Sequence, residues 1–272
     1  MTYTFKDFGQ RAEESPLSIR TIINGTELDS QLTADGFSFR TLRVNGRGKI
    51  SNALDADSIY GRQGGLFRNS SLDPRSIVVT AMVRADSNAA YRRGMTNINL
   101  LLYSRDIHAI RFTDEPAYTF YGAVQRVEDG DESSNTQIVE IEFVCYDPFK
   151  YSTTKTHTTT NATRLDIDSQ LRIVPEEITI TFPNSTDARD FSLNNTTTGR
   201  RIRFQQDGTA SGKTIKIRQK DDYIGYTESV NHIGGLNVAY SHFDEFDVIS
   251  GDRLVVTPKP ESIVIKYKGA SL

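Results

Sequence analysis

The sequence predicts a mainly β protein with two domains, an N-terminal β-rich domain that contains one α-helix and a C-terminal β-sandwich or jelly roll. A chain of 272 residues with 37% hydrophobic and 10% aromatic residues is long enough to bury two cores of ordinary size. Short segments of alternating apolar and polar residues, typical of strands, recur along the chain. A polar, threonine-rich stretch at 152–163 separates them into two groups. We therefore expect domains at 1–151 and 173–272, with 152–172 as a linker or an exposed strand.

The N-terminal domain is expected to contain one helix among its strands. Residues 76–84 are apolar at successive positions, which is typical of a strand buried on both faces. A helix should follow, because Ser87 can cap its first turn and apolar residues recur at helical spacing up to Leu102, although Gly94 lowers its intrinsic stability. The other strands predicted in this domain are 18–23, 36–44, 107–112, 118–127 and 137–145.

Three segments of this half are expected to be exposed over at least part of their surface. One face of the strand at 137–145 is apolar and the other has charged residues, so the sheet is either half-exposed or a subunit contact. The segment at 45–73 contains five glycines and little periodic apolar pattern, which predicts a long loop or a projecting arm. The polar residues at 129–135 are expected to form an exposed hairpin tip.

The C-terminal half has shorter strand signals at closer intervals. Asn, Gly and Pro separate them, and this spacing is typical of a β-sandwich or jelly roll. The predicted strands are 178–182, 191–193, 202–204, 215–217, 223–226, 236–238, 254–256 and 263–267.

The charge distribution argues against a nucleic-acid-binding protein. Residues 1–150 contain 17 Lys and Arg against 20 Asp and Glu, and since the totals are 32 and 35, the rest has 15 against 15. Neither half has the basic surplus that phosphate binding needs. The cations of the first half are 14 Arg and 3 Lys. This bias indicates either bidentate pairing with carboxylates at interfaces or a compositional preference of the source.

Motifs that bind nucleotides or supply a nucleophile are missing. Asn45–Ile50 lacks the third glycine and the following helix of a dinucleotide-binding turn, and Gly61–Gly65 lacks the Lys-Ser/Thr pair of a P-loop. Cys145, the single cysteine, has no evident partner histidine and is expected to be buried. His242 and Asp244 could project to one side of a strand, but two groups leave a metal site incomplete. We therefore expect no enzyme, no cofactor and no metal.

The sequence has no signal of membrane insertion or export. Residues 1–7 contain no charged region followed by an apolar run, and no later run approaches the roughly 18 apolar residues of a membrane span. We expect a chain made and folded in a cytoplasm, with no membrane partner.

The order of several motifs is more informative than any one of them. The strand ending on Cys145-Tyr146-Asp147-Pro148-Phe149 closes a series in the first half, and residues 243–256 read as a strand, a turn and a strand in the second. The earlier members of the series are Ile59–Gly65, Ser76–Arg84, the helix up to Leu102, Ile110–Tyr118 and Tyr121–Val124. In this order they resemble the distal tail protein (Dit) family of siphophages, bacteriophages with long flexible tails. Arg253 departs from the family pattern, which often has an asparagine there.

The resemblance implies a hexameric ring at the tail tip. Split-barrel-like N-terminal domains would form a belt around the DNA channel, and galectin-like C-terminal domains would project outward. The partners implied are the tail tube protein, the end of the tape-measure protein, the tail-associated tip protein and receptor-binding proteins, all in the virion after synthesis in a bacterial cytoplasm. DNA is expected to pass through without specific binding, which a slightly acidic belt allows. The arm would pack on a neighbouring subunit through the candidate interface residues Tyr60, Arg62, Leu66, Phe67 and Arg68.

Two other functions remain open at this point. The C-terminal sandwich could be a carbohydrate-binding module that stacks cell-wall sugars on exposed aromatic side chains. The candidates for this contact are Tyr223, Tyr226, Tyr240 and Phe243. An enzyme acting on wall glycans would need two carboxylates facing each other across a cleft, which a sequence does not place. The sequence does not distinguish a phage from a prophage or a tail-like bacteriocin.

Overall fold

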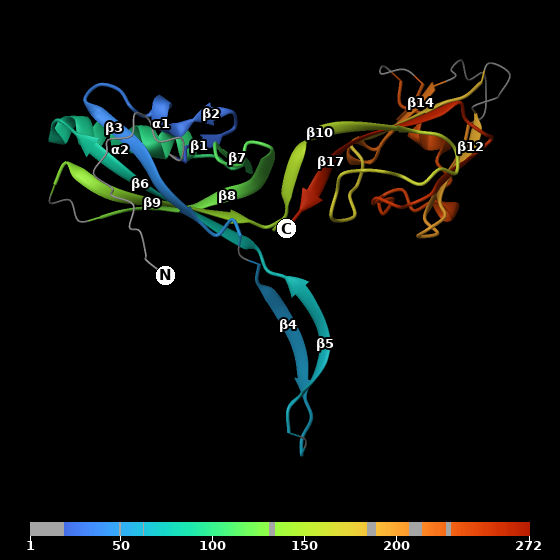
Figure 1. The fold of residues 1–272 in the computed structure, drawn as a ribbon, viewed down its shortest axis with the longest axis horizontal. Coiled ribbons are helices and arrows are strands. Elements are labelled where there is room, and N and C mark those ends of the chain that lie inside the picture. The colour runs from blue at the N-terminus through green and yellow to red at the C-terminus, as the bar shows by residue number, and fades with distance from the viewer. Residues whose placement is uncertain are drawn as a thin grey trace, which may run out of the picture. The chain divides into compact units, whose positions relative to one another are not determined.

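The computed structural model describes residues 19–48, 50–61, 63–130, 134–183, 189–206, 214–226 and 230–272. The chain divides into two compact units, Met1–Pro148 and Phe149–Leu272, each with its own hydrophobic core. Both are built mainly of antiparallel strands, as the sequence predicts (Figure 1).

Seven strands of the N-terminal unit form one antiparallel sheet in the order β2-β1-β7-β8-β9-β6-β3. The long strand β8 belongs to both halves of this sheet, because its first part pairs with β7 and its second part with β9. The elements are β1 (Thr21–Ile23), β2 (Thr26–Glu27), α1 (Leu28–Gln31), β3 (Phe37–Asn45), β6 (Arg75–Ala85), α2 (Asn88–Leu102), β7 (His108–Phe112), β8 (Tyr118–Asp129) and β9 (Thr136–Cys145).

The helix α2 begins and packs as its sequence requires. The Ser87 hydroxyl accepts a hydrogen bond from the backbone N–H of Ala90, a cap of the kind that contributes about 1 kcal/mol. Gly94 lies over the ring of Phe37, and a Cβ at this glycine would come within 2.2 Å of that ring. The glycine that lowers helix propensity is therefore what lets α2 approach β3. The buried residues of the helix are Ala90, Tyr91, Gly94, Ile98 and Leu102.

The segment at 45–73 is a hairpin of two strands, β4 (Asn52–Ser58) and β5 (Gly65–Leu72). These strands form a sheet of their own (Figure 1), so the interpretation as a long loop is wrong and the interpretation as an arm is correct. The alternation that reveals a half-buried strand is weak here, because nearly every residue of both strands is exposed.

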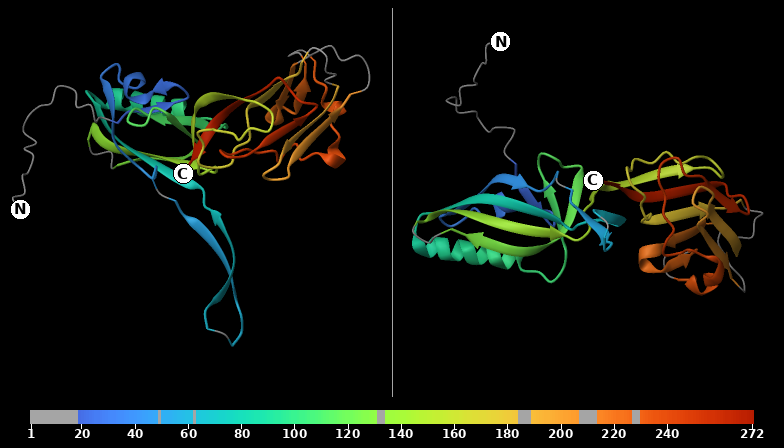
Figure 2. Two further views of the ribbon diagram at one scale, coloured as in Figure 1. Left: turned by 45° about the vertical axis from the view of Figure 1, so that its right-hand side comes forward. Right: turned by 90° about the horizontal axis from the view of Figure 1, so that it is seen from below.

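The C-terminal unit is a sandwich of two antiparallel sheets, β15-β14-β11-β17-β10 and β13-β12-β16 (Figure 2). Apolar residues of both sheets meet in one core, in which Phe191 contacts Phe182 and Phe204 with ring centroids 6.2 and 5.2 Å away. The strands are β10 (Lys150–Thr159), β11 (Glu177–Thr181), β12 (Asp190–Asn195), β13 (Arg201–Gln205), β14 (Thr214–Arg218), β15 (Tyr223–Gly225), β16 (Leu254–Thr257) and β17 (Ser262–Ser271). Three short 3-10 turns complete the unit, η1 (Gln219–Asp221), η2 (Ile233–Gly235) and η3 (Val238–Tyr240).

One predicted strand of this unit is wrong. Residues 236–238 do not form a strand, because Leu236 makes a single bridge to Phe204 and the chain then turns into η3. Val238 is 76% exposed, so this short apolar run lacks the burial that a core strand needs. Among the described residues, no helix has the length and apolar character to cross a membrane.

Candidate functional site

The arm formed by β4 and β5 is the most exposed apolar feature of the N-terminal unit. Leu54 is 70% exposed and Phe67 62% exposed, and Tyr60 at the tip is fully open to solvent. A two-stranded hairpin with no covering layer is marginal in water by itself. Its exposed apolar side chains are therefore expected to bind another molecule.

The register of the arm separates its side chains onto two faces. The two residues of each cross-strand pair lie on the same face of the hairpin. Arg68 of β5 has no partner in β4, because its neighbours Phe67 and Asn69 pair with Ala56 and Asp55, which are adjacent residues. This bulge places Phe67 on the same face as Leu54, and it places Leu66 on the opposite face. One face holds Leu54, Ala56, Phe67 and Leu72 together with Asn52, Ser58, Gly65 and Ser70, and we call it the apolar face for its two large apolar side chains at the centre, Leu54 and Phe67. The opposite, polar face holds Ala53, Asp55, Asp57, Leu66, Asn69 and Ser71. Arg68 forms an ion pair with Asp57.

The root of the arm is fixed by a close backbone approach. Gly46 has φ +93°, and a Cβ there would lie 1.9 Å from the carbonyl oxygen of Ser76 at the start of β6. The two legs of the arm then meet, as Asp73 donates its N–H to the Ser51 carbonyl at 2.9 Å and Ser51 Oγ donates to Asp73 Oδ2 at 2.7 Å.

Two arginines join this root to the body of the unit. Arg47 Nη1 and Nη2 each donate to an oxygen of Asp114 at 2.8 Å, and the Arg47 guanidinium lies 4.8 Å from the ring centroid of Phe112. Arg75 donates through Nη1 to the Arg47 carbonyl and lies 5.4 Å from the ring of Phe120. The two rings touch edge to face, with centroids 6.2 Å apart. We call these five residues the root clamp.

The hydrogen bonds from Arg47 lower the pKa of Asp114 below its ordinary value, so the pair is charged at neutral pH. Burial lowers the pKa of Arg75, which is only 4% exposed. Its Nε and Nη2 have no hydrogen-bond partner among the described residues. This buried cation is therefore an energetically costly part of the root clamp.

The predicted interface residues Tyr60, Leu66, Phe67 and Arg68 all lie on the arm and are exposed, whereas Arg62 lies outside the described residues. The bulge places Leu66 and Phe67 on opposite faces, which the sequence alone did not indicate. Their role in a subunit contact stays a prediction.

The predicted sugar-stacking residues do not share one surface environment. Tyr223 and Phe243 are buried in the C-terminal unit, 5% and 7% exposed, so their ring faces are not available to a sugar. Tyr226 is half-buried with its ring 5.3 Å from that of His232. Only Tyr240 of the four is well exposed, at 58%, and the guanidinium of Arg201 covers one side of its ring.

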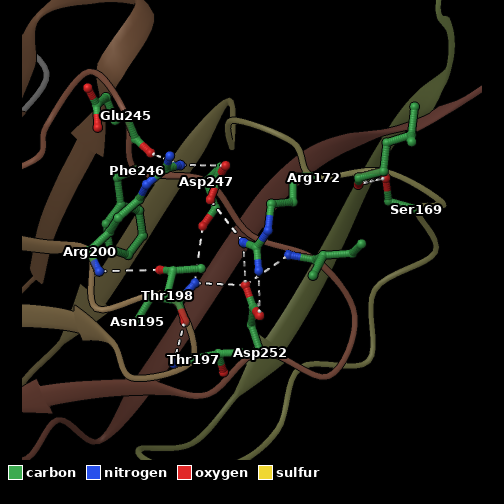
Figure 3. A network of polar contacts seen from close by, with 12 residues as sticks. Ser169, Arg172, Asn195, Thr197, Thr198, Arg200, Glu245, Phe246, Asp247 and Asp252 are labelled. Atoms are coloured by element: carbon green, nitrogen blue, oxygen red, sulfur yellow. Dashed lines mark hydrogen bonds and ion pairs between the residues drawn. The ribbon is translucent and has the colours of Figure 1, made fainter. Parts of the chain in front are cut away.

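A buried polar network organises one end of the C-terminal sandwich (Figure 3). Asp252, 1% exposed, accepts hydrogen bonds from Arg172 at 3.0 and 3.1 Å and from Asn195 Nδ2 at 2.7 Å. Arg172 also donates to Asp247 at 2.9 Å, and Arg200 forms an ion pair with the same carboxylate at 2.5 Å. These contacts join three segments that are distant in the sequence.

The network has the chemistry of a structural element. The Arg172 guanidinium occupies the position between the two carboxylates that a cation would need, and its hydrogen bonds to Asp252 raise its own pKa. In the part of the chain that the structure describes, no group of three or more His, Cys, Asp or Glu residues is placed to hold a metal. Among the described residues, no third such group joins His242 and Asp244 in a metal site.

Cys145 is fully buried at the end of β9 and is a free thiol. Burial raises its pKa to about 11. A thiol needs the thiolate form to act as a nucleophile, so this cysteine has very little of its reactive form near neutral pH.

The sequence reasoning missed the root clamp and the polar network. Arg47 and Asp114 are 67 residues apart, and Arg172 and Asp252 are 80 apart, so no local spacing connects them. The arginine bias of the first half was the only available signal for the clamp.

Comparison with known proteins agrees with this fold. Residues 14–145 match the phage tail protein RIFT-related domain. The distal tail protein of Bacillus phage SPP1 is 31% identical over 156 residues, which are 57% of this chain and 61% of that relative. The match thus spans less than two thirds of the relative's length.

Solved structures extend the likeness to both units. The crystal structure of the SPP1 Dit protein superposes on this chain with a TM-score of 0.75. The two chains are 23% identical, and the superposition covers 92% of this chain and 98% of that one. The SPP1 protein is described as a paradigm of the hub adsorption apparatus in phages that infect Gram-positive bacteria. A chain of the phage P2 baseplate in its activated conformation gives 0.50 at 12% identity over the same shares. The chain is therefore similar in sequence and in fold to the distal tail protein of Bacillus phage SPP1, and its residues 14–145 match the phage tail protein RIFT-related domain.

Proposed function

We propose that this chain is a structural subunit of the phage tail tip, which forms a ring between the tail tube and the baseplate and serves as a hub for host-adsorption proteins. The observation that carries the proposal is the arm, whose apolar face has no partner within the described part of its own chain. The chain has no catalytic role in this proposal.

A ring explains why a protein keeps such an arm. Each subunit of a closed ring uses two different surfaces, one for the preceding and one for the following subunit. An arm that projects from one subunit can bind a different surface of the next subunit, which is the kind of contact that such a ring requires. Burial of Leu54 and Phe67 would each stabilise the contact by up to about 1.5–3 kcal/mol.

We propose the remaining assignments from the similarity to distal tail proteins. The ring is a hexamer, its N-terminal units form the belt around the DNA channel, and its C-terminal units project toward receptor-binding proteins. The tail tube protein and the end of the tape-measure protein dock on one side, and the tail-associated tip protein on the other. With 17 cationic against 20 acidic residues in 1–150, the belt has no cationic surplus that would retain DNA.

The solution mass of the purified chain tests this proposal. Light scattering behind size exclusion should give a mass near that of a hexamer of the 30.5 kDa chain at high concentration. The double variant Leu54→Ser/Phe67→Ser on the apolar face should be monomeric with unchanged circular dichroism. Leu100→Ser is the matched control, since this leucine of α2 is 68% exposed and lies outside the arm, and it should assemble normally. A chain that stays monomeric at every concentration, alone and with tail tube protein, would refute the ring.

The competing carbohydrate-binding function has one observation in its favour, the exposed ring of Tyr240 beside Arg201. Incubation of the full chain with a host cell-wall polysaccharide array separates the two functions. The structural proposal expects no binding. Binding that is lost in Tyr240→Ala but not in Tyr223→Phe would support the carbohydrate-binding function instead.

A further inference from the structure

The direction of the arm depends on the segment that connects it to β3. The last ladder pair between β3 and β6 is Asn45 with Val78, and β6 enters the body at Arg75, which pairs with Cys145 of β9. We call residues 46–51 the leg of the arm on this side, and its described residues, 46–48, 50 and 51, have no ladder partner in the body. The contacts between Ser51 and Asp73 join this leg to the other one, in which Asp73 and Pro74 lead directly into β6.

Arg47 lies within this leg, directly after Gly46, at whose positive φ the chain leaves β3, and we call Arg47 the pivot of the arm. Its two hydrogen bonds to Asp114 have the planar bidentate geometry that restricts both the position and the orientation of a guanidinium. Asp114 follows β7 in the turn before β8, and both strands belong to the body. The side chain of Arg47 thus connects the pivot to the body sheet.

Arg75 connects the same pivot from the other side. It is the first residue of β6, it is almost fully buried, and its Nη1 donates to the backbone carbonyl of Arg47. Each arginine stacks on a phenylalanine that is itself 1% exposed, Arg47 on Phe112 and Arg75 on Phe120. The pivot residue is therefore held at its side chain and at its backbone by groups that cannot easily move.

We infer that Arg47 and Arg75 are positioning residues, which fix the direction in which the arm leaves the N-terminal unit and so present its apolar face for assembly. This inference rests on the proposed function only in its last step, which is that the positioned arm takes part in assembly. A purely structural role would predict loss of stability without any change in arm direction.

The distance between two spin labels measures arm direction without any need for assembly. One label at Tyr60→Cys lies at the arm tip, and the other at Leu100→Cys lies on α2, where the native side chain is 68% exposed. The native Cys145 is buried and stays unlabelled. Both labels belong to the same unit. Pulsed electron paramagnetic resonance should give a narrow distance distribution in the wild-type background.

Arg47→Ala and Asp114→Asn should broaden this distribution by at least about twofold, because both changes remove the charged bidentate contact and leave the leg held mainly by the Arg75 bond to the carbonyl of residue 47. Arg47→Lys keeps the charge but loses the bidentate geometry, so its width should be intermediate. Arg126→Ala is the control, since it removes another arginine–carboxylate contact of the same unit, to Glu142 at 2.7 Å. Its distribution should equal that of the wild type.

The mass of the same variants separates this inference from the proposed function. Broad distributions together with a lower assembled fraction support the positioning role. An Arg47→Ala variant that is folded and as narrow as the wild type overturns the clamp, whatever its mass. A broad distribution with normal assembly also overturns the positioning role. A narrow wild-type distribution in a chain that never assembles refutes the ring but leaves the clamp intact.

Discussion

Removal of Arg172 tests the polar network of the C-terminal unit most directly. In Arg172→Ala, the buried carboxylate of Asp252 loses the two hydrogen bonds at 3.0 and 3.1 Å and keeps only those from Asn195 and from the Ile249 backbone. Hydrogen bonds to charged groups contribute about 1.5–3 kcal/mol each. Because the Arg172 side chain is 36% exposed, solvent screens part of this energy. We expect the free energy of unfolding to fall by about 2–3 kcal/mol.

The matched control is Arg203→Ala. Arg203 is equally exposed, at 35%, and pairs with Asp190 at 2.6 Å, but this carboxylate is 50% exposed and can be solvated when its partner is removed. The control should lose at most about 1 kcal/mol, as surface ion pairs do. The two variants differ mainly in the burial of the orphaned carboxylate.

The assay has to assign unfolding to one unit. Urea titration followed by circular dichroism reports both units, and reaction of Cys145 with a thiol reagent reports the opening of the N-terminal unit alone. Arg172→Ala should shift only the transition in which Cys145 stays protected. For a unit of this size, the expected loss corresponds to a melting temperature roughly 6–12 °C lower. If Arg172→Ala were no less stable than Arg203→Ala, our account of the network would be refuted.

Three further predictions concern the N-terminal unit. Gly46→Ala should lower the free energy of unfolding by about 2 kcal/mol or more, because a side chain there would have a positive φ and would overlap the backbone of Ser76. Gly48→Ala is the control, and it should leave the urea unfolding curve unchanged because the space around Gly48 is open. Native Cys145, with its pKa raised to about 11, should not react with a thiol reagent at pH 8.5, where unfolded protein reacts at once; rapid native labelling would contradict its burial. The hydrogen bonds from Arg47 lower the pKa of Asp114, so their contribution is fully present above the unfolded-state pKa of about 3.9 and is lost as the pH falls through the lower folded-state value. The spin-label distribution of folded wild type should therefore broaden as the pH is lowered below about 4, whereas that of Asp114→Asn should not change with pH.

The sequence predicted those elements whose signal is local. Ser87 and the apolar spacing up to Leu102 define α2, and the alternation before Cys145 defines β9, because burial on one face leaves a period in the sequence. The strands of the arm leave no such period, since water surrounds both of their faces in the single chain. The contacts of Arg47 and Arg172 depend on how distant segments meet, and a sequence contains no local record of that. For the same reason the sequence made Tyr223 a candidate for a sugar contact, because it did not indicate that this side chain is buried.

The bulge at Arg68 has a consequence for how the arm can change length. In a regular strand, loss of one residue reverses the facing of every side chain beyond it, much as a frameshift alters every codon downstream. Arg68 has no partner in β4, so its deletion would leave Phe67 opposite Ala56 and Asn69 opposite Asp55. The arm can therefore be shortened by one residue at this position without exchanging its two faces. Elsewhere in β5, only changes of two residues preserve the surface that it presents.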